Sequence, residues 1–216
     1  MIRKQDIQRA RALFKEWDNS RRWDASTPLF INHTLKKAED SLHTAKALLA
    51  LMSNKELQER ALPHIEYNAS LWIINAAYYS MFFLAQVLLG KDGRKLPEGA
   101  KDTHKTILLA VLYYFIIKGS GLEGKKEIMP EDIKRSRMSD ALIIFQHAQE
   151  ESEELLQVKR AKEAVDSLKA ELDKRTELTY RSTKSAELSF AKVSIGRAER
   201  FREIMDEYLQ ARGMKK

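Results

Sequence analysis

The chain contains no cysteine in its 216 residues, and it has only 8 glycines and 4 prolines. The absence of cysteine excludes disulfides and thiolate metal sites within the chain and is compatible with a reducing cytoplasm. Few glycines and prolines, together with 32% charged residues, favour long helices over a β-rich fold. The apolar–polar alternation of half-buried strands is hard to find. We therefore expect an all-α protein located in the cytoplasm.

The N-terminus has no apolar stretch of the kind found in secretory signals, because residues 1–17 are charged and amphipathic. A block of one charge is also missing, since 38 basic residues are scattered among 31 acidic ones. The resulting net charge of +7 admits an acidic partner such as RNA through phosphate attraction. Without a basic tail, however, the charge by itself favours RNA only slightly.

One long uncharged stretch runs from Leu71 to Leu89 and is rich in tyrosine and phenylalanine. Its length is close to the ~20 residues needed to cross a bilayer. Against a membrane span, Asn75, Ser80 and Gln86 would cost free energy in hydrocarbon, and two tyrosines lie mid-segment rather than at an interface. We therefore expect no membrane partner but a buried central helix, with Asn75 as a core amide and the aromatics of 78–83 mainly in the core.

Start and stop signals divide the chain into helices. Thr27 followed by Pro28 predicts a helix start, because a capping hydroxyl precedes a residue that is preset for the first turn. The predicted helices cover residues 3–17, 28 to about 53, 63–90, 102–117, 130 to about 178, and about 186 onward. Together they predict an antiparallel up-and-down helical bundle. We divide the chain into an N-terminal helix and connector, 1–26, and the bundle, 27–216.

The longest helical pattern contains apolar residues at a 3-4-3-4 spacing, which is the pattern of a packing seam. The pattern lasts for little more than two heptads, which is short for a coiled coil. It predicts a long helical projection at about 150–178, either a protruding hairpin or a dimer arm. The seam residues are Val158, Ala161, Val165, Leu168 and Leu172.

Four segments in order carry a family likeness. Residues 35–49 read LKKAEDSLHTAKALL, residues 77–89 read AYYSMFFLAQVLL, and Asp102-Thr103-His104 leads into an apolar helix. The fourth segment, residues 174–180, reads KRTELTY. From about residue 30 to 210 the chain thus resembles HEPN-domain proteins. Their hallmarks are an AYYxMF-type run and, near the start of the final helix, an Arg followed four to six residues later by a His.

The resemblance implies a helical bundle that forms a homodimer and pairs the Arg-containing segments of two subunits. Many such proteins are RNases that need no metal or other cofactor, and several act as toxins beside a nucleotidyltransferase-like antitoxin. Others are non-catalytic RNA-binding or scaffolding domains. The implied partners are therefore a second copy of the chain, RNA and a nucleotidyltransferase-like antitoxin.

Two departures from the family pattern bear on this choice: Ala76 stands where many relatives carry Arg, and Tyr180 stands in the place of the motif His. A His with a pKa near ~6.5 is available as a base at neutral pH, whereas a Tyr near ~10 is ionised in about one molecule in a thousand. Cleavage of RNA would then use Arg175 to bind and polarise the phosphate, with Tyr180 or His104 assisting proton transfer.

His104 lies at a predicted helix start, where the helix dipole would depress its pKa and keep it neutral. Its alternative role is that of a capping or partly buried histidine, and Arg175 with Tyr180 could equally form a solvated helix end.

Two functions of the protein stay open. One is a HEPN-like protein that binds or cleaves RNA, as a toxin or defence component. The other is a non-catalytic interaction module that pairs with a protein partner.

Overall fold

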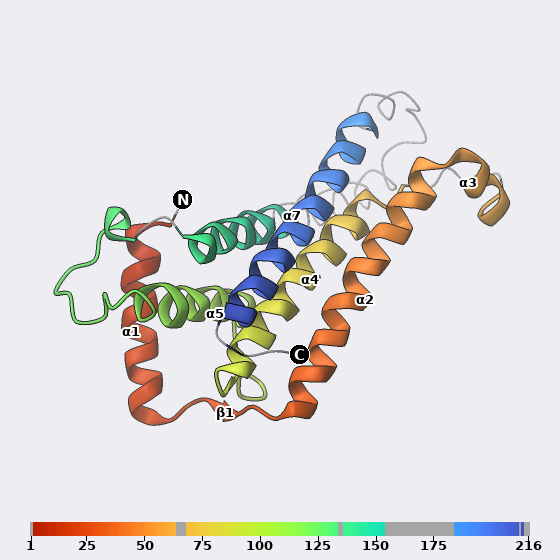
Figure 1. Cartoon of the computed structure of the whole chain (residues 1–216). Helices are drawn as coiled ribbons and strands as arrows, with labels where there is room; N and C mark the ends of the chain where they lie inside the picture. Colours follow the sequence, from red (N-terminus) through yellow and green to blue (C-terminus); the bar gives the residue numbers. More distant parts are fainter. Residues whose placement is uncertain (1, 64–67, 134–135, 154–183, 212, 214–216) are drawn as a thin grey trace, which may run out of the picture.

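The computed structural model describes residues 2–63, 68–133, 136–153, 184–211 and 213. These residues are mostly helical, which confirms the predicted all-α bundle (Figure 1). Arg175, Tyr180 and most of the predicted projection at about 150–178 lie outside the described residues.

The bundle is built around two antiparallel helices, α2 and α4, with α7 beside α4 (Figure 1). The helical segments α5, η1 and 137–153 cross this set, and α1 packs against α5 and η1. Two short strands, β1 and β2, pair antiparallel near the link between α1 and α2. The elements are α1 (Lys4–Ser20), β1 (Asp24–Ala25), α2 (Pro28–Ser53), α3 (Lys55–Ala61), α4 (Ser70–Lys91), β2 (Arg94–Lys95), α5 (Thr103–Val111), the π-helix η1 (Leu112–Ile117), the 3₁₀ turn η2 (Pro130–Asp132), a helix over 137–153, and α7 (Lys184–Ala211).

The helix start predicted at Thr27 and Pro28 is confirmed, because α2 begins at Pro28. The Thr27 hydroxyl accepts a hydrogen bond from the backbone N–H of Phe30 at 3.2 Å, and Pro28 occupies the first turn. The helix then continues to Ser53 with alanines 38 and 45 on its buried stripe. Because these side chains are small, they permit close packing against α4.

The predicted start of the apolar helix at Pro63 is wrong, because α4 begins at Ser70 and a separate short helix, α3, precedes it. The Asn54 side chain accepts a hydrogen bond from the Leu57 N–H at 3.0 Å and so starts α3. A proline disfavours helical backbone at the residue before it. For this reason α3 ends before Pro63 rather than joining α4.

Within the described part of the chain, α4 is the one helix long and apolar enough to cross a membrane by length and composition. The most apolar 18-residue stretch of this helix is 72% buried inside the bundle. Fourteen of its residues are buried, and they surround the helix rather than lining one stripe. This burial is typical of a central core helix, as expected for residues 71–89.

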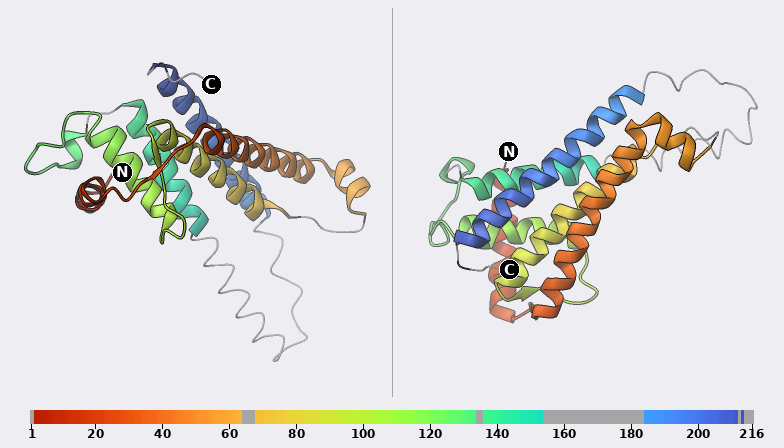
Figure 2. Two further views of the ribbon diagram at one scale, coloured as in Figure 1. Left: turned by 90° about the horizontal axis from the view of Figure 1, so that it is seen from below. Right: turned by 45° about the vertical axis from the view of Figure 1, so that its right-hand side comes forward.

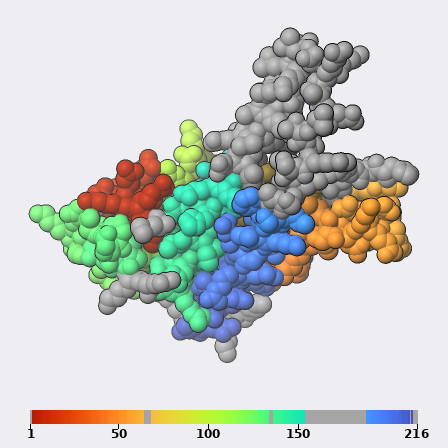
Figure 3. Space-filling view, turned by 90° about the horizontal axis from the view of Figure 1, so that it is seen from above, coloured from red at the N-terminus to blue at the C-terminus, as the bar shows by residue number. Residues whose placement is uncertain are grey.

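The predicted helix start at Pro130 is also wrong, because Pro130 begins only the three-residue turn η2. The next helix covers 137–153, and the Ser136 hydroxyl accepts from the Ser139 N–H at 3.2 Å at its start. In the space-filling view this helix lies next to α7 (Figure 3). Between them, the rings of Phe145 and Phe201 lie 5.6 Å apart at their centroids. Ala191, Ile195, Ala198 and Met205 of α7 are buried as well.

An aromatic cluster joins α1 to the rest of the core. Phe14 of α1 is fully buried, and its ring centroid lies 5.5–5.8 Å from those of Trp17, Trp23, Tyr113 and Tyr114. Two polar bonds fix the cluster, since the indole of Trp23 donates to the Tyr114 hydroxyl and this hydroxyl donates to Asp18. Although α1 and α2 lie far apart (Figures 1 and 2), α1 therefore shares the central core.

Candidate functional site

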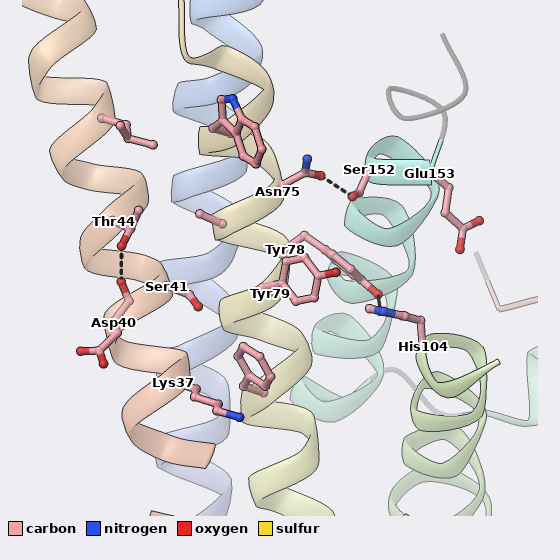
Figure 4. Close-up of a pocket in the computed structure, with 14 residues that line it drawn as sticks. Lys37, Asp40, Ser41, Thr44, Asn75, Tyr78, Tyr79, His104, Ser152 and Glu153 are labelled. Carbon is pink, nitrogen blue, oxygen red and sulfur yellow. Dashed lines mark hydrogen bonds between the residues drawn. The ribbon is translucent and has the colours of Figure 1, made fainter. Parts of the chain in front are cut away.

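A groove of about 970 Å³ lies between α2 and α4, with the start of α5 and the end of the described helix 137–153 at its border (Figure 4). The two long walls of the groove are one face of α2 and one face of α4. Their lining residues recur about every three or four positions, which places them on the same side of each helix. The lining side chains are Lys37, Asp40, Ser41, Thr44 and Leu48 of α2, Trp72, Asn75, Ala76, Tyr78, Tyr79 and Phe83 of α4, His104 of α5, and Ser152 and Glu153.

The α4 wall is aromatic and partly open to solvent. Trp72 is 62% exposed and Tyr79 is 41% exposed, whereas Tyr78 and Phe82 are buried. The expectation that the aromatics of 78–83 belong to the core is thus right for Tyr78 and Phe82 and wrong for Tyr79. Trp72 and Tyr79 are seven residues apart, which is two helical turns or about 10 Å along the axis.

His104 is held at the border of the groove by Tyr78. The Tyr78 hydroxyl and His104 Nδ1 lie 2.7 Å apart, and the imidazole stacks on Phe82 with centroids 4.3 Å apart. Burial lowers the pKa of His104 against the opposing effect of the Glu153 carboxylate. The neutral state expected from the sequence thus has desolvation as its main cause.

The same burial, with the nearby Glu153 charge, raises the pKa of Tyr78, so its hydroxyl keeps its proton. Among the described residues, His104 is the hydrogen-bond partner of that hydroxyl. We therefore assign Tyr78 as the donor to Nδ1, which places the proton of the neutral imidazole on Nε2. His104 is a half-buried side chain whose Nε2–H is a hydrogen-bond donor.

Lowering the pH should destabilise the fold through His104. Its pKa is lowered in the folded state from about 6.5 in the unfolded chain, so between these values the unfolded chain binds a proton that the folded chain does not. Stability is then lost as the pH falls from about 6.5 through the folded pKa. Urea unfolding at about pH 7.5 and about pH 5 should show a larger loss for the wild type than for His104→Gln. Equal losses would contradict the assignment.

Asn75 ties α4 to the helix over 137–153. Its side-chain oxygen accepts a hydrogen bond from the Ser152 hydroxyl at 2.7 Å, and Ser152 is buried. The amide nitrogen points away from Ser152 (Figure 4). Asn75 is therefore a half-buried amide with one core partner, and its nitrogen is a donor at the groove wall.

The charges in the groove are mixed. Lys37 provides a cation, and its Nζ lies 5.8 Å from the centroid of the Phe83 ring. Asp40 and Glu153 provide two carboxylates. With His104 neutral, the groove is therefore not a phosphate pocket. It suits a flat group that stacks on aromatic rings and donates hydrogen bonds from its edge.

Of the three site residues predicted from the sequence, His104 is the one the structure describes, and Arg175 and Tyr180 fall outside it. Trp72, Tyr79 and Asp40 also line the groove and were not predicted from the sequence. The spacing of Trp72 and Tyr79 on one helix face was a usable signal, whereas the pairing with α2 was not visible from local patterns. Among the described residues, no three His, Cys, Asp or Glu side chains are grouped to hold a metal ion.

No family model matches the chain. No curated protein and no solved structure matches it either. The HEPN likeness therefore stays a hypothesis that rests on the quoted sequence segments.

Proposed function

We propose that this protein is a HEPN-like RNA-binding protein that takes unpaired bases of a single strand into the groove between α2 and α4. The observation that carries the proposal is the aromatic wall, where Trp72 and Tyr79 are partly exposed on one face of α4. Sequence-tolerant binding of single strands depends on such stacking surfaces, because every base has a π-face.

The polar groups of the groove match the edges of bases better than they match phosphates. The carboxylates of Asp40 and Glu153 can accept hydrogen bonds from exocyclic amino groups. Asn75 and His104 supply donors for ring nitrogens and carbonyl oxygens. The phosphates would remain outside the groove, where the net charge of +7 attracts them.

Cleavage is the part of the proposal that depends on the family likeness. In a homodimer, Arg175 would bind and polarise the phosphate, and Tyr180 or His104 would assist proton transfer without a metal. With its proton on Nε2, His104 would act by donating a hydrogen bond rather than as a base. Such an activity fits a toxin or defence component that is paired with a nucleotidyltransferase-like antitoxin.

Binding of short RNA homopolymers in EDTA tests the base-in-groove model. Adenine and cytosine carry exocyclic amino groups and uracil does not, so oligo-A and oligo-C should bind more tightly than oligo-U. Asp40→Asn should reduce that preference, whereas Asp24→Asn, an exposed change of equal charge on β1, should not. Equal affinity for all three homopolymers, or no binding, would overturn the model.

The same samples test cleavage. Products that form in EDTA with the wild type and disappear with Arg175→Ala would support a metal-independent RNase with chemistry at that segment. Intact binding without cleavage across varied RNAs would remove the RNase part and leave an RNA-binding protein.

One observation favours a second candidate, the non-catalytic module that pairs with a protein partner. Six of the 14 side chains that line the groove are apolar or aromatic and one is a lysine, and partly exposed Trp and Tyr side chains are enriched at protein interfaces. Failure of every RNA to bind would favour this candidate over the first.

A further inference from the structure

The two walls of the groove continue past its lining residues toward the end of the bundle where β1 and β2 lie (Figure 1). On α2, Phe30 lies seven residues before Lys37, and on α4, Gly90 lies seven residues after Phe83. Seven residues make almost two helical turns, or about 10 Å, so each pair shares one face of its helix. Because α2 and α4 are antiparallel, Phe30 and Gly90 extend the two walls in the same direction.

The groove itself closes at Gly90. A Cβ atom at this position would lie 3.2 Å from the Ile31 side chain and 3.3 Å from the Phe30 ring, so α2 and α4 touch there. Gly90 is buried, whereas Phe30 and Phe83 are half-buried. A strand that follows the groove in this direction therefore leaves it after Phe83 and passes over the surface beside Phe30.

Two ammonium groups lie over aromatic rings along this path. Lys37 extends from α2 toward α4, and its Nζ lies 5.8 Å from the centroid of the Phe83 ring (Figure 4). The Nζ of Lys95, on β2, lies 5.5 Å from the centroid of the Phe30 ring. Among the described residues, neither lysine forms an ion pair with a carboxylate, although Asp24 is opposite Lys95 in the β1–β2 pairing. Cation–π attraction thus positions each ammonium group and leaves hydrogens that can be donated to an anion.

The cations next to these two lysines in the sequence are already engaged. Lys36 pairs with Asp40 at 3.3 Å, and Arg94 pairs with Asp92. Each of them would have to give up a carboxylate before it bound a phosphate, whereas the two lysines over the rings would not. The path beside the groove therefore offers phosphates two specific contacts in addition to the general attraction of the net charge.

From these observations we propose that Lys37 and Lys95 bind phosphates of the strand whose bases stack in the groove. The inference rests on the proposed function, and it makes the ligand a polynucleotide strand rather than a free nucleotide. Proteins that bind single strands combine stacking side chains with cations along the backbone in this way. From Trp72 to Gly90, α4 rises by about 27 Å. At roughly 3.4 Å per stacked nucleotide, a strand of about eight nucleotides covers this length.

The salt dependence of binding tests the two phosphate contacts, with a labelled RNA of about twelve nucleotides and fluorescence anisotropy as the readout. Each phosphate contact on a single strand contributes about 0.7 to the slope of log affinity against log salt. Lys37→Gln combined with Lys95→Gln should therefore reduce the steepness of the slope by about 1.4. Lys15→Gln combined with Lys192→Gln removes the same charge from exposed positions of α1 and α7 and should leave the slope unchanged.

The length of the RNA supplies a second readout. A trinucleotide that stacks on Trp72 and Tyr79 does not reach Lys95, whereas the longer RNA does. Lys95→Gln should therefore weaken binding of the longer RNA about fivefold at about 0.1 M salt, the value of one phosphate contact, and should leave binding of the trinucleotide unchanged.

The outcomes separate this inference from the proposed function. An unchanged slope in the Lys37–Lys95 variant, with binding that still depends on Trp72 and Tyr79, would overturn the inference and leave the proposed function standing. An equal change of slope in both double variants would also overturn it, because the attraction would then be general. If the folded wild type bound no RNA, the proposed function and this inference would both be wrong.

Discussion

Replacing Phe14 by alanine should lower the free energy of unfolding by about 3–5 kcal/mol, the usual cost of removing a buried aromatic ring. Phe14 is 0% exposed, and four other aromatic rings lie within 6 Å of it at their centroids. These rings come from α1, the following connector and η1, and polar bonds fix the positions of Trp23 and Tyr114. They cannot collapse freely into the space that the lost ring leaves. The remaining cavity should therefore account for a large part of the loss in the free energy of unfolding.

Chemical unfolding monitored by far-UV circular dichroism would measure this loss. Phe190→Ala is the matched control, because Phe190 is also helical but is 53% exposed on α7. Its effect should stay within about 0.5 kcal/mol. A loss below about 1 kcal/mol for Phe14→Ala would contradict the tight packing of the cluster.

Removing both Trp72 and Tyr79 should weaken binding of single-stranded RNA by about thirtyfold or more, since each stacked base contributes about 1–3 kcal/mol and two stacking side chains are lost. This expectation rests on the proposed function. Both side chains are partly exposed on the α4 wall of the groove, so their truncation removes stacking surface while the buried face of α4 remains. Fluorescence anisotropy with labelled oligonucleotides at several salt concentrations would measure the change.

The salt dependence separates stacking from charge. The double alanine variant removes no cation, so the slope of log affinity against log salt should match that of the wild type. The control is the double alanine variant of Phe190 and Val193, two exposed apolar residues of α7 that do not line the groove. If the control lost as much affinity as the groove variant, the groove would not be the RNA site.

Sequence motifs of a few residues predicted a helix start correctly where the motif itself caps the helix. Thr27 and Pro28 start α2 because a hydroxyl cap and a fixed φ act within a single turn. The same reasoning was wrong at the other two prolines. Pro63 precedes the start of α4 by seven residues, and Pro130 begins only a short turn. A proline marks where a helix can begin, and packing of the following residues decides whether it does.

The candidate site was predictable only in part, for a physical reason. The neutral state of His104 was foreseen, but its partner Tyr78 lies 26 positions away on another helix. Likewise, the hydrogen bond between Asn75 and Ser152 joins residues 77 positions apart. Helical spacing gives the face on which a side chain lies, but the facing helix is chosen by the packing of the whole core.

The aromatic cluster around Phe14 has a consequence for how the molecule opens. Because α1 contributes its rings to the central core, it cannot detach without bringing water to Tyr113 and Tyr114. Most chain ends fray at little cost, whereas amide protons on the buried side of α1 should exchange with solvent only in the rare events that open the core. We therefore expect the buried side of the N-terminal helix to exchange as slowly as the core it packs against.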